Sequence, residues 1–157
     1  MRGKLAIGAA IVAALLVGMI TVSFAAGSRV VPRVTSRMRI HVVERPKTDR
    51  VVDTGKNGDS SGDLLTFHNP IYNGTNSKRV GHDQGDCIRI SPKRGSWECR
   101  WITFLRGGSI TVEGPFYDTR PSTFAVTGGT GDFSNARGSM GLRFRKNGFD
   151  FIFHLQP

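Results

Sequence analysis

From residue 37 onward, short runs of alternating apolar and polar residues are separated by glycine, proline and asparagine. This pattern predicts β-strands joined by tight turns. Residues 38–42 alternate as a half-buried strand does, and residues 137–145 repeat the alternation. Asn147-Gly148 then has the composition of a hairpin turn. No segment after residue 36 has a sustained helical period, so helical fold classes are excluded.

The spacing of these turns leaves room for about eight strands and for no long crossover between parallel strands. We therefore predict an all-β fold, an eight-stranded antiparallel β-barrel over residues 37–157. Glycines inside the strands favour a barrel over a sandwich, because sharp curvature needs positions without a side chain. A barrel of this size encloses a lumen that is either packed or holds one small ligand.

The first residues have the order of a secretory signal. A cationic start at residues 1–4 precedes an apolar run at residues 5–20, and Ser23-Phe24-Ala25 supplies small residues for cleavage. We predict a signal peptide over residues 1–25 and a flexible tether over 26–36, and hence a secreted, extracellular protein, with the cell envelope as an alternative destination. An uncleaved anchor is disfavoured because the apolar run is short for a membrane span. Membrane contact is then expected only through the signal segment before cleavage.

The chain is basic, with a formal net charge of +10 at pH 7 from 22 Lys and Arg against 12 Asp and Glu. These basic residues are spread along the sequence, mostly at alternate strand positions and in turns. A phosphate backbone is instead recognised by a compact basic stripe. We therefore predict no specific nucleic-acid binding, and only loose attraction to anionic surfaces.

Cys87 and Cys99 are the two cysteines of the chain, and they flank the turn-like segment 91–96. A hairpin centred near Lys93 places them opposite each other, so we predict a disulfide in an oxidising compartment. Two thiols without a nearby histidine pair make a poor metal site. The four histidines also lack metal-ligand spacing, and no metal site is predicted.

Asp59 and Asp63 lie in the polar, glycine-rich segment 53–63. If this loop covers the barrel mouth, one of them is a candidate general acid whose pKa an apolar pocket would raise. The alternative is that both aspartates cap turns with their side-chain oxygens, and we favour it.

Two further catalytic candidates lie on predicted strands. His82 shares one strand face with Gln84, and this face either lines the lumen or meets water. Glu113 lies in an otherwise apolar strand, where a buried carboxylate must be paired or protonated. Arg100 on the neighbouring strand is its expected partner, and a structural ion pair is favoured over catalysis. The pocket candidates are Asn69, Tyr72, Gln84, Arg100 and Tyr117.

Three segments resemble the allene oxide cyclase barrel superfamily, which includes the dirigent proteins. Residues 126–138 contain GGTGDF followed by ARG, residues 80–85 read VGHDQG, and GDSSGD at 58–63 leads into FHNPIY at 67–72. The resemblance is to secreted members of bacterial type. It implies an eight-stranded antiparallel barrel, often a homotrimer, with a pocket at one end. It also implies cyclisation of an allene oxide or guidance of radical coupling, but no catalytic residue is carried over.

Two functions follow from these observations. The first is a barrel without a cofactor that binds a small hydrophobic molecule and directs its cyclisation or stereoselective coupling, chiefly by orienting it. The second is a non-catalytic extracellular carrier of a small ligand, or a cell-envelope binding module. The resemblance favours the first.

Overall fold

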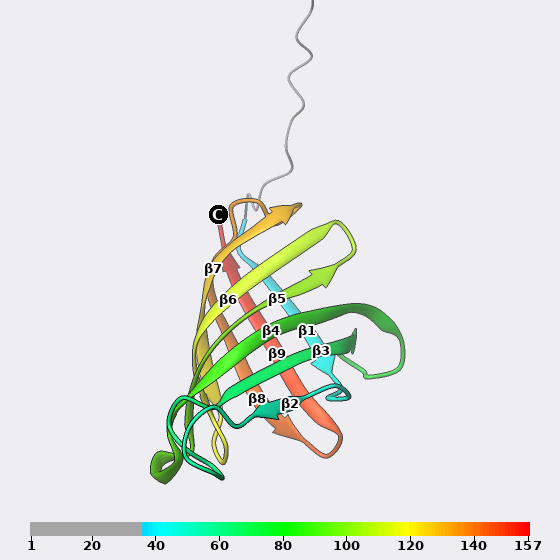
Figure 1. Cartoon of the computed structure of the whole chain (residues 1–157). Coiled ribbons are helices and arrows are strands. Elements are labelled where there is room, and N and C mark those ends of the chain that lie inside the picture. Colours follow the sequence, from blue (N-terminus) through cyan, green and yellow to red (C-terminus); the bar gives the residue numbers. More distant parts are fainter. Residues whose placement is uncertain (1–35) are drawn as a thin grey trace, which may run out of the picture.

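The computed structural model describes residues 36–157, so the predicted signal peptide and nearly all of the predicted tether lie outside the described residues. The described chain is all-β, as predicted, with one turn of 3₁₀ helix at Pro92–Arg94 and no α-helix (Figure 1). No helix in residues 36–157 has the length and apolar character needed to span a bilayer. The strands are β1 (Met38–Glu44), β2 (Arg50–Val52), β3 (Leu64–Asn73), β4 (Arg79–Ser91), β5 (Ser96–Leu105), β6 (Gly108–Tyr117), β7 (Ser122–Gly131), β8 (Arg137–Arg145) and β9 (Gly148–Gln156).

Eight of these strands form the closed antiparallel barrel, in the order β1-β9-β8-β7-β6-β5-β4-β3, with β3 paired back to β1. The prediction of an eight-stranded barrel is therefore confirmed, but β2 is an additional strand that the sequence pattern did not predict. The pairing between β1 and β3 covers only the end of β3, at residues 71–73. This leaves the start of β3 without a partner on that side, and β2 pairs with it there, Val51 opposite Leu65.

The barrel interior is filled by side chains from one face of each strand, as the alternation requires. The ring of Trp101 lies near its centre and packs edge-on against Phe124 at 4.4 Å and Phe67 at 6.0 Å between centroids. The barrel is therefore largely packed. Other fully or nearly buried members of this core are Val42, Ile71, Ile110, Val112, Val126, Met140, Leu142, Phe151, Phe153 and Leu155.

The predicted disulfide is present between Cys87 and Cys99, which are direct cross-strand partners in the β4–β5 pair. Two residues before Cys87 in β4, Gly85 lies opposite Trp101. A Cβ atom at Gly85 would lie 2.3 Å from the Arg100 carbonyl oxygen and from the Trp101 Cβ. The missing side chain therefore lets β5 approach β4 closely where the large indole enters the core.

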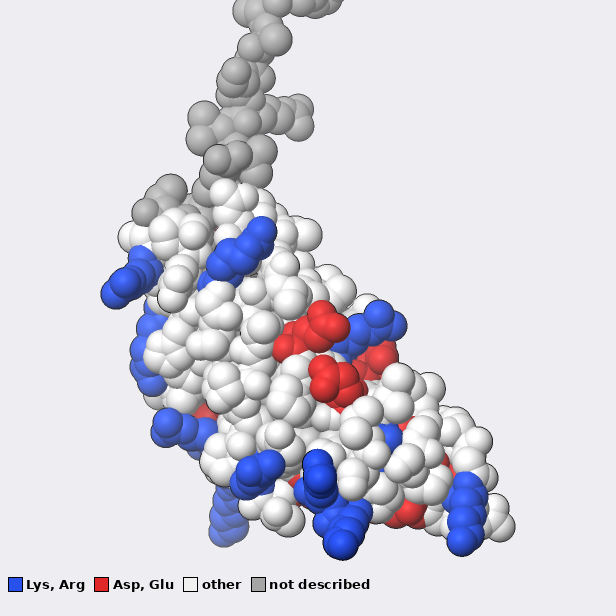
Figure 2. Space-filling view, turned by 90° about the vertical axis from the view of Figure 1, so that its left-hand side faces the viewer, with Lys and Arg blue, Asp and Glu red and all other residues white. Residues whose placement is uncertain are grey.

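Lys and Arg side chains are distributed around the visible face of the barrel, with Asp and Glu side chains among them (Figure 2). They form no single stripe on that face.

Candidate functional site

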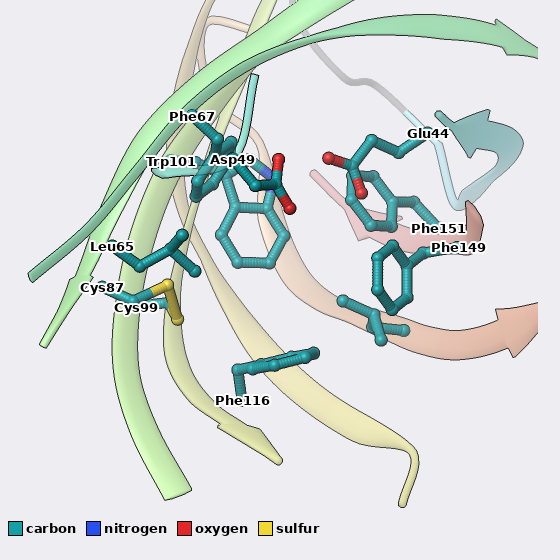
Figure 3. A pocket seen from close by; sticks show the side chains of 11 residues that line it. Glu44, Asp49, Leu65, Phe67, Cys87, Cys99, Trp101, Phe116, Phe149 and Phe151 are labelled. Atoms are coloured by element: carbon teal, nitrogen blue, oxygen red, sulfur yellow. A yellow bond between two sulfur atoms is a disulfide. The ribbon is translucent and has the colours of Figure 1, made fainter. Parts of the chain in front are cut away.

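A cavity of about 80 Å³ lies at the barrel end where β1 and β6 stop and β3 and β9 begin (Figure 3). Its walls are mostly apolar and include the Cys87–Cys99 disulfide. Since about 10–15 Å³ holds one water molecule, the cavity has room for more than a single water. The apolar lining consists of Leu65, Phe67, Cys87, Cys99, Trp101, Phe116, Leu142, Phe149 and Phe151.

One side of the cavity is acidic, because Glu44 and Asp49 also line it. Glu44 is the last residue of β1 and is 5% exposed, whereas Asp49 is exposed on the segment that follows. Figure 3 shows the two carboxyl groups on the same side of the cavity, above Phe116 and Phe149. A ligand in the cavity thus meets one buried and one exposed carboxyl group.

The fully buried side chain of Asn69 holds this acidic side together. Its Nδ2 donates hydrogen bonds of 2.6 Å to Glu44 Oε1 and to Asp49 Oδ1. Its Oδ1 accepts hydrogen bonds from the backbone N–H groups of Lys47, at 2.7 Å, and Thr48, at 3.0 Å. One amide therefore fixes both carboxyl groups and the chain segment between them, and Asn69 is the pocket candidate that the structure places at the site.

A second buried carboxyl group, Asp83, lies behind Asn69 on β4. Asp83 is 0% exposed, its Oδ1 accepts the Asn69 backbone N–H at 3.2 Å, and its Oδ2 has no partner among the described residues. Burial raises the pKa of Asp83 to about 9, and the Glu44 charge contributes in the same direction. Asp83 is therefore protonated at neutral pH.

Glu44 has the pKa of a proton-transfer group. Burial raises its pKa to about 7, the hydrogen bond from Asn69 opposes this shift, and the Asp49 charge adds to it. A carboxyl group whose pKa is raised toward neutral can donate or accept a proton there.

Aromatic rings line the mouth of the cavity. Phe149 contacts Phe116, with 6.0 Å between ring centroids, and Phe144, at 5.3 Å. Phe144 is 43% exposed although it lies on the inward face of β8, because β8 ends one residue later. The rim is therefore apolar and reaches solvent.

His82 and Gln84, predicted as lumen candidates, lie on the outer face of β4. The inward residues are Asp83, which is buried, and the disulfide-bonded Cys87. The lumen interpretation of His82 and Gln84 is therefore wrong: the strand faces were correctly separated, but the opposite face points inward. The His82 ring instead stacks on Phe104 at 4.6 Å, and burial, followed by the charges of His68 and Arg79, lowers its pKa.

Asp59 and Asp63 lie outside the cavity. Asp63 is buried and accepts hydrogen bonds from the backbone N–H groups of Ser60, at 2.7 Å, and Thr54, at 3.2 Å, which lowers its pKa. Asp59 forms a paired ion contact with Arg89, with Nε 2.6 Å from Oδ1. Both carboxyl groups order the 53–63 loop, and both pKa values are lowered rather than raised.

Glu113 is exposed, so the expectation of a buried carboxylate at this position is wrong. Arg100 is its cross-strand neighbour, but the ion pair of Arg100 is with Asp86, at 3.3 Å. In the structure Glu113 lies on the outer face of β6, which is accessible to solvent.

Tyr72 and Tyr117 each carry a guanidinium group over the ring. Arg45 lies 3.6 Å from the Tyr72 ring centroid and Arg120 lies 3.7 Å from that of Tyr117. Neither tyrosine lines the lumen cavity. These contacts assign both rings to packing with basic side chains.

Glu44, Asp49 and Asp83 were missed as site residues. For Glu44 a signal existed: it continues the inward alternation of Ile40 and Val42, which puts a carboxyl group on an apolar face. Asp49 had no such signal, because it follows the strand and reaches the cavity only through Asn69. In residues 36–157 no group of three or more His, Cys, Asp or Glu side chains is arranged to hold a metal ion.

An eight-stranded antiparallel barrel with an apolar, partly acidic cavity at one end is the structural class that these observations define. Within that class the chain belongs to the allene oxide cyclase family, whose family model matches residues 37–154. This confirms the resemblance seen in the sequence motifs.

Solved structures with the same fold differ in what they do. A pyocyanin demethylase is 24% identical with a TM-score of 0.68, over 76% of this chain and 100% of that one. A pterocarpan synthase dirigent protein is 19% identical with a TM-score of 0.63, over 77% and 85%. A Diels-Alderase from Streptomyces koyangensis is 12% identical with a TM-score of 0.58, over 77% and 70%. At these identities the likeness concerns the fold.

Proposed function

We propose that this protein is a secreted barrel that binds a small, largely apolar molecule in its lumen and directs its cyclisation or stereoselective coupling without a cofactor. The observation that carries this proposal is Glu44, a buried carboxyl group that lines an apolar cavity and whose pKa burial raises to about 7. Such a group is positioned to give a proton to a bound molecule or to take one from it. The fold relatives named as a pterocarpan synthase dirigent protein and a Diels-Alderase add general support.

The cavity walls contribute by restricting the ligand. Rings at the mouth and the Trp101 indole in the core confine an apolar molecule to few orientations, which favours one cyclic or stereochemical outcome over others. The same apolar walls lower the effective dielectric constant around Glu44, which strengthens electrostatic interactions there.

Asn69 and Asp83 support Glu44 rather than replace it. Asn69 fixes the carboxyl group of Glu44 by a 2.6 Å hydrogen bond to one of its two oxygens, Oε1. Asp83 stays protonated at neutral pH and does not add a second buried negative charge beside it. Glu44 is therefore the group that changes charge during the reaction.

The test is native mass spectrometry of the oxidised protein after exposure to extracts of its own source, followed by product analysis. We expect an isomer or coupled product that forms only with protein present, and a loss of at least about tenfold in rate with Glu44→Gln. Asp86→Asn is the matched control, because it removes one carboxylate from the outer face of the same barrel wall. A compound that binds unaltered would instead establish the carrier function, and an active Glu44→Gln would remove the role of Glu44.

A further inference from the structure

The charged groups of the lumen have a sign opposite to that of the chain as a whole. The protein carries a formal net charge of +10, yet both charged side chains that line the cavity, among the residues described, are acidic. They are Glu44 and Asp49, and no Lys, Arg or His from residues 36–157 lines the cavity with them. An anionic ligand would therefore be repelled where it enters, whereas a cation would be attracted.

The indole N–H of Trp101 is a second, independent feature. Trp101 lines the cavity and is 4% exposed, and its Nε1 has no hydrogen-bond partner in the described part of the chain. Figure 3 shows its ring projecting between Leu65 and Phe149 toward the centre of the cavity. A buried donor is rarely left unpaired, and this N–H still lacks an acceptor, which a bound molecule can supply.

The aromatic lining suits the same ligand. Phe116 and Phe149 stand at the mouth, below the carboxyl groups, and Trp101 and Phe151 lie further in (Figure 3). The faces of such rings attract cations, and Trp attracts them most strongly. Carboxyl groups on one side and aromatic faces on the other form the arrangement that recognises organic cations.

We propose that the lumen selects an organic cation: an apolar, ring-containing molecule that bears a positively charged nitrogen and a hydrogen-bond acceptor. The charged nitrogen meets Glu44 and Asp49, and the acceptor meets the Trp101 N–H. This inference rests on the proposed function only in placing the ligand in the lumen.

Ligand affinity then depends on pH in a defined direction. The titratable groups that act on Glu44 are Asp49 at the cavity edge and Asp83 behind Asn69, and both are acidic. As pH rises through about 7, Glu44 loses its proton and the negative charge of the cavity increases. A cation therefore binds more tightly at pH 8 than at pH 6.

The experiment compares three probes of similar size: 4-methoxybenzylamine, which is protonated over this pH range, 4-methoxybenzyl alcohol and 4-methoxybenzoate. They share the ring and the methoxy acceptor, and the group opposite the methoxy is cationic, neutral or anionic. Binding to the full oxidised protein is measured by titration calorimetry and by Trp fluorescence. We expect the amine to bind at least about tenfold more tightly than the alcohol, and the benzoate to bind most weakly.

Two variants assign this preference to the acidic side. Glu44→Gln and Asp49→Asn each keep an oxygen that can accept the Asn69 hydrogen bond but remove the charge. Each is expected to reduce the preference for the amine several-fold, and Glu44→Gln is expected to abolish the rise in affinity between pH 6 and pH 8. Asp86→Asn, on the outer face, leaves both unchanged. Thermal unfolding of each variant confirms that the fold is retained.

Equal binding of amine and alcohol, or tighter binding of the benzoate, overturns the cation proposal while leaving the lumen as the ligand site. Amine preference that survives both acidic variants also overturns it. If none of the three probes binds or changes Trp fluorescence, the cation proposal fails. Product formation from source extracts in the same preparation would then show that the proposed function stands without it.

Discussion

Replacing Asp83 with Asn should make the protein more stable at neutral and alkaline pH. Asp83 is fully buried with one carboxyl oxygen unpaired, and its pKa in the folded protein is about 9, against about 3.9 in an unfolded chain. Between these two values the folded chain holds a proton that the unfolded chain has released. The free energy of unfolding must therefore fall as pH rises, and it should stop falling above about pH 9.

The size of the effect follows from the linkage relation. One extra proton in the folded state costs about 1.4 kcal/mol of stability for each pH unit. From pH 5 to pH 8 the contribution of Asp83 amounts to roughly 4 kcal/mol, a large part of the stability of a small domain. Asn cannot ionise, and its side-chain oxygen can still accept the backbone N–H of Asn69. The variant should lose this part of the pH dependence and keep the fold.

The assay is urea denaturation of the oxidised protein at pH 5, 6.5 and 8, comparing wild type with Asp83→Asn. The stability difference between the two proteins is the quantity to follow, because the contributions of titrating groups far from Asp83 cancel in it. The difference should grow in favour of the variant as pH rises. Asp86→Asn, at a partly exposed position of the same strand, should leave the pH dependence of wild type unchanged.

A stability difference that stays constant from pH 5 to pH 8 would refute this reasoning. So would a variant that is less stable than wild type at pH 8, because Asp83 would then be ionised and favourably paired in the folded protein. Either result would also remove the argument that Asp83 stays neutral beside Glu44.

Three further predictions concern stability. Arg89→Met removes a nearly buried guanidinium that forms ion pairs with two loops. Urea denaturation should show a free energy of unfolding that is lower by about 3 kcal/mol, and a loss below about 1 kcal/mol would contradict this prediction. Replacing both Cys87 and Cys99 with Ala should cost about 2–3 kcal/mol, which reduction of wild type should reproduce. Gly138 has φ of 124°, and a Cβ atom there would lie 2.0 Å from the His154 carbonyl oxygen. Gly138→Ala should therefore lower the free energy of unfolding by more than about 2 kcal/mol, measured by thermal unfolding. An unchanged unfolding midpoint would show that the strand can shift to accept the side chain.

Much of the barrel could be predicted because local patterns specify it. Alternation identified the closing strands, and the turn between Cys87 and Cys99 specified their pairing and the hairpin register. β2 was missed because its three residues have no alternation of their own. It exists because the start of β3 has an edge that β1 does not reach, which is a tertiary cause.

The site could be predicted only in part, because periodicity shows which residues share a face but not which face is inside. His82 and Asp83 are adjacent in sequence. His82 was the candidate because a histidine can transfer a proton near neutral pH, yet Asp83 is the residue that points inward. The disulfide was a usable indicator, since Cys87 lies on the same face as Asp83 and disulfide sulfur is normally buried. The prediction that Glu113 is buried was wrong for the same reason as that for His82. The strand face on which Glu113 lies determines its exposure, and the apolar residues beside it in the sequence do not.

The pairing of β1 with β9 also determines when a lumen exists. β1 pairs with β9 along its whole length, and the contact between His41 and Asp150 joins residues 109 positions apart. During synthesis β1 can pair with β9 only after β9 has been made. Closing the long loop between these two strands is slow. A nascent chain lacking β9 is an open sheet whose edges invite pairing with other chains. The cavity, and any ligand affinity it confers, therefore arises in one late event once the C-terminal strand is free to dock.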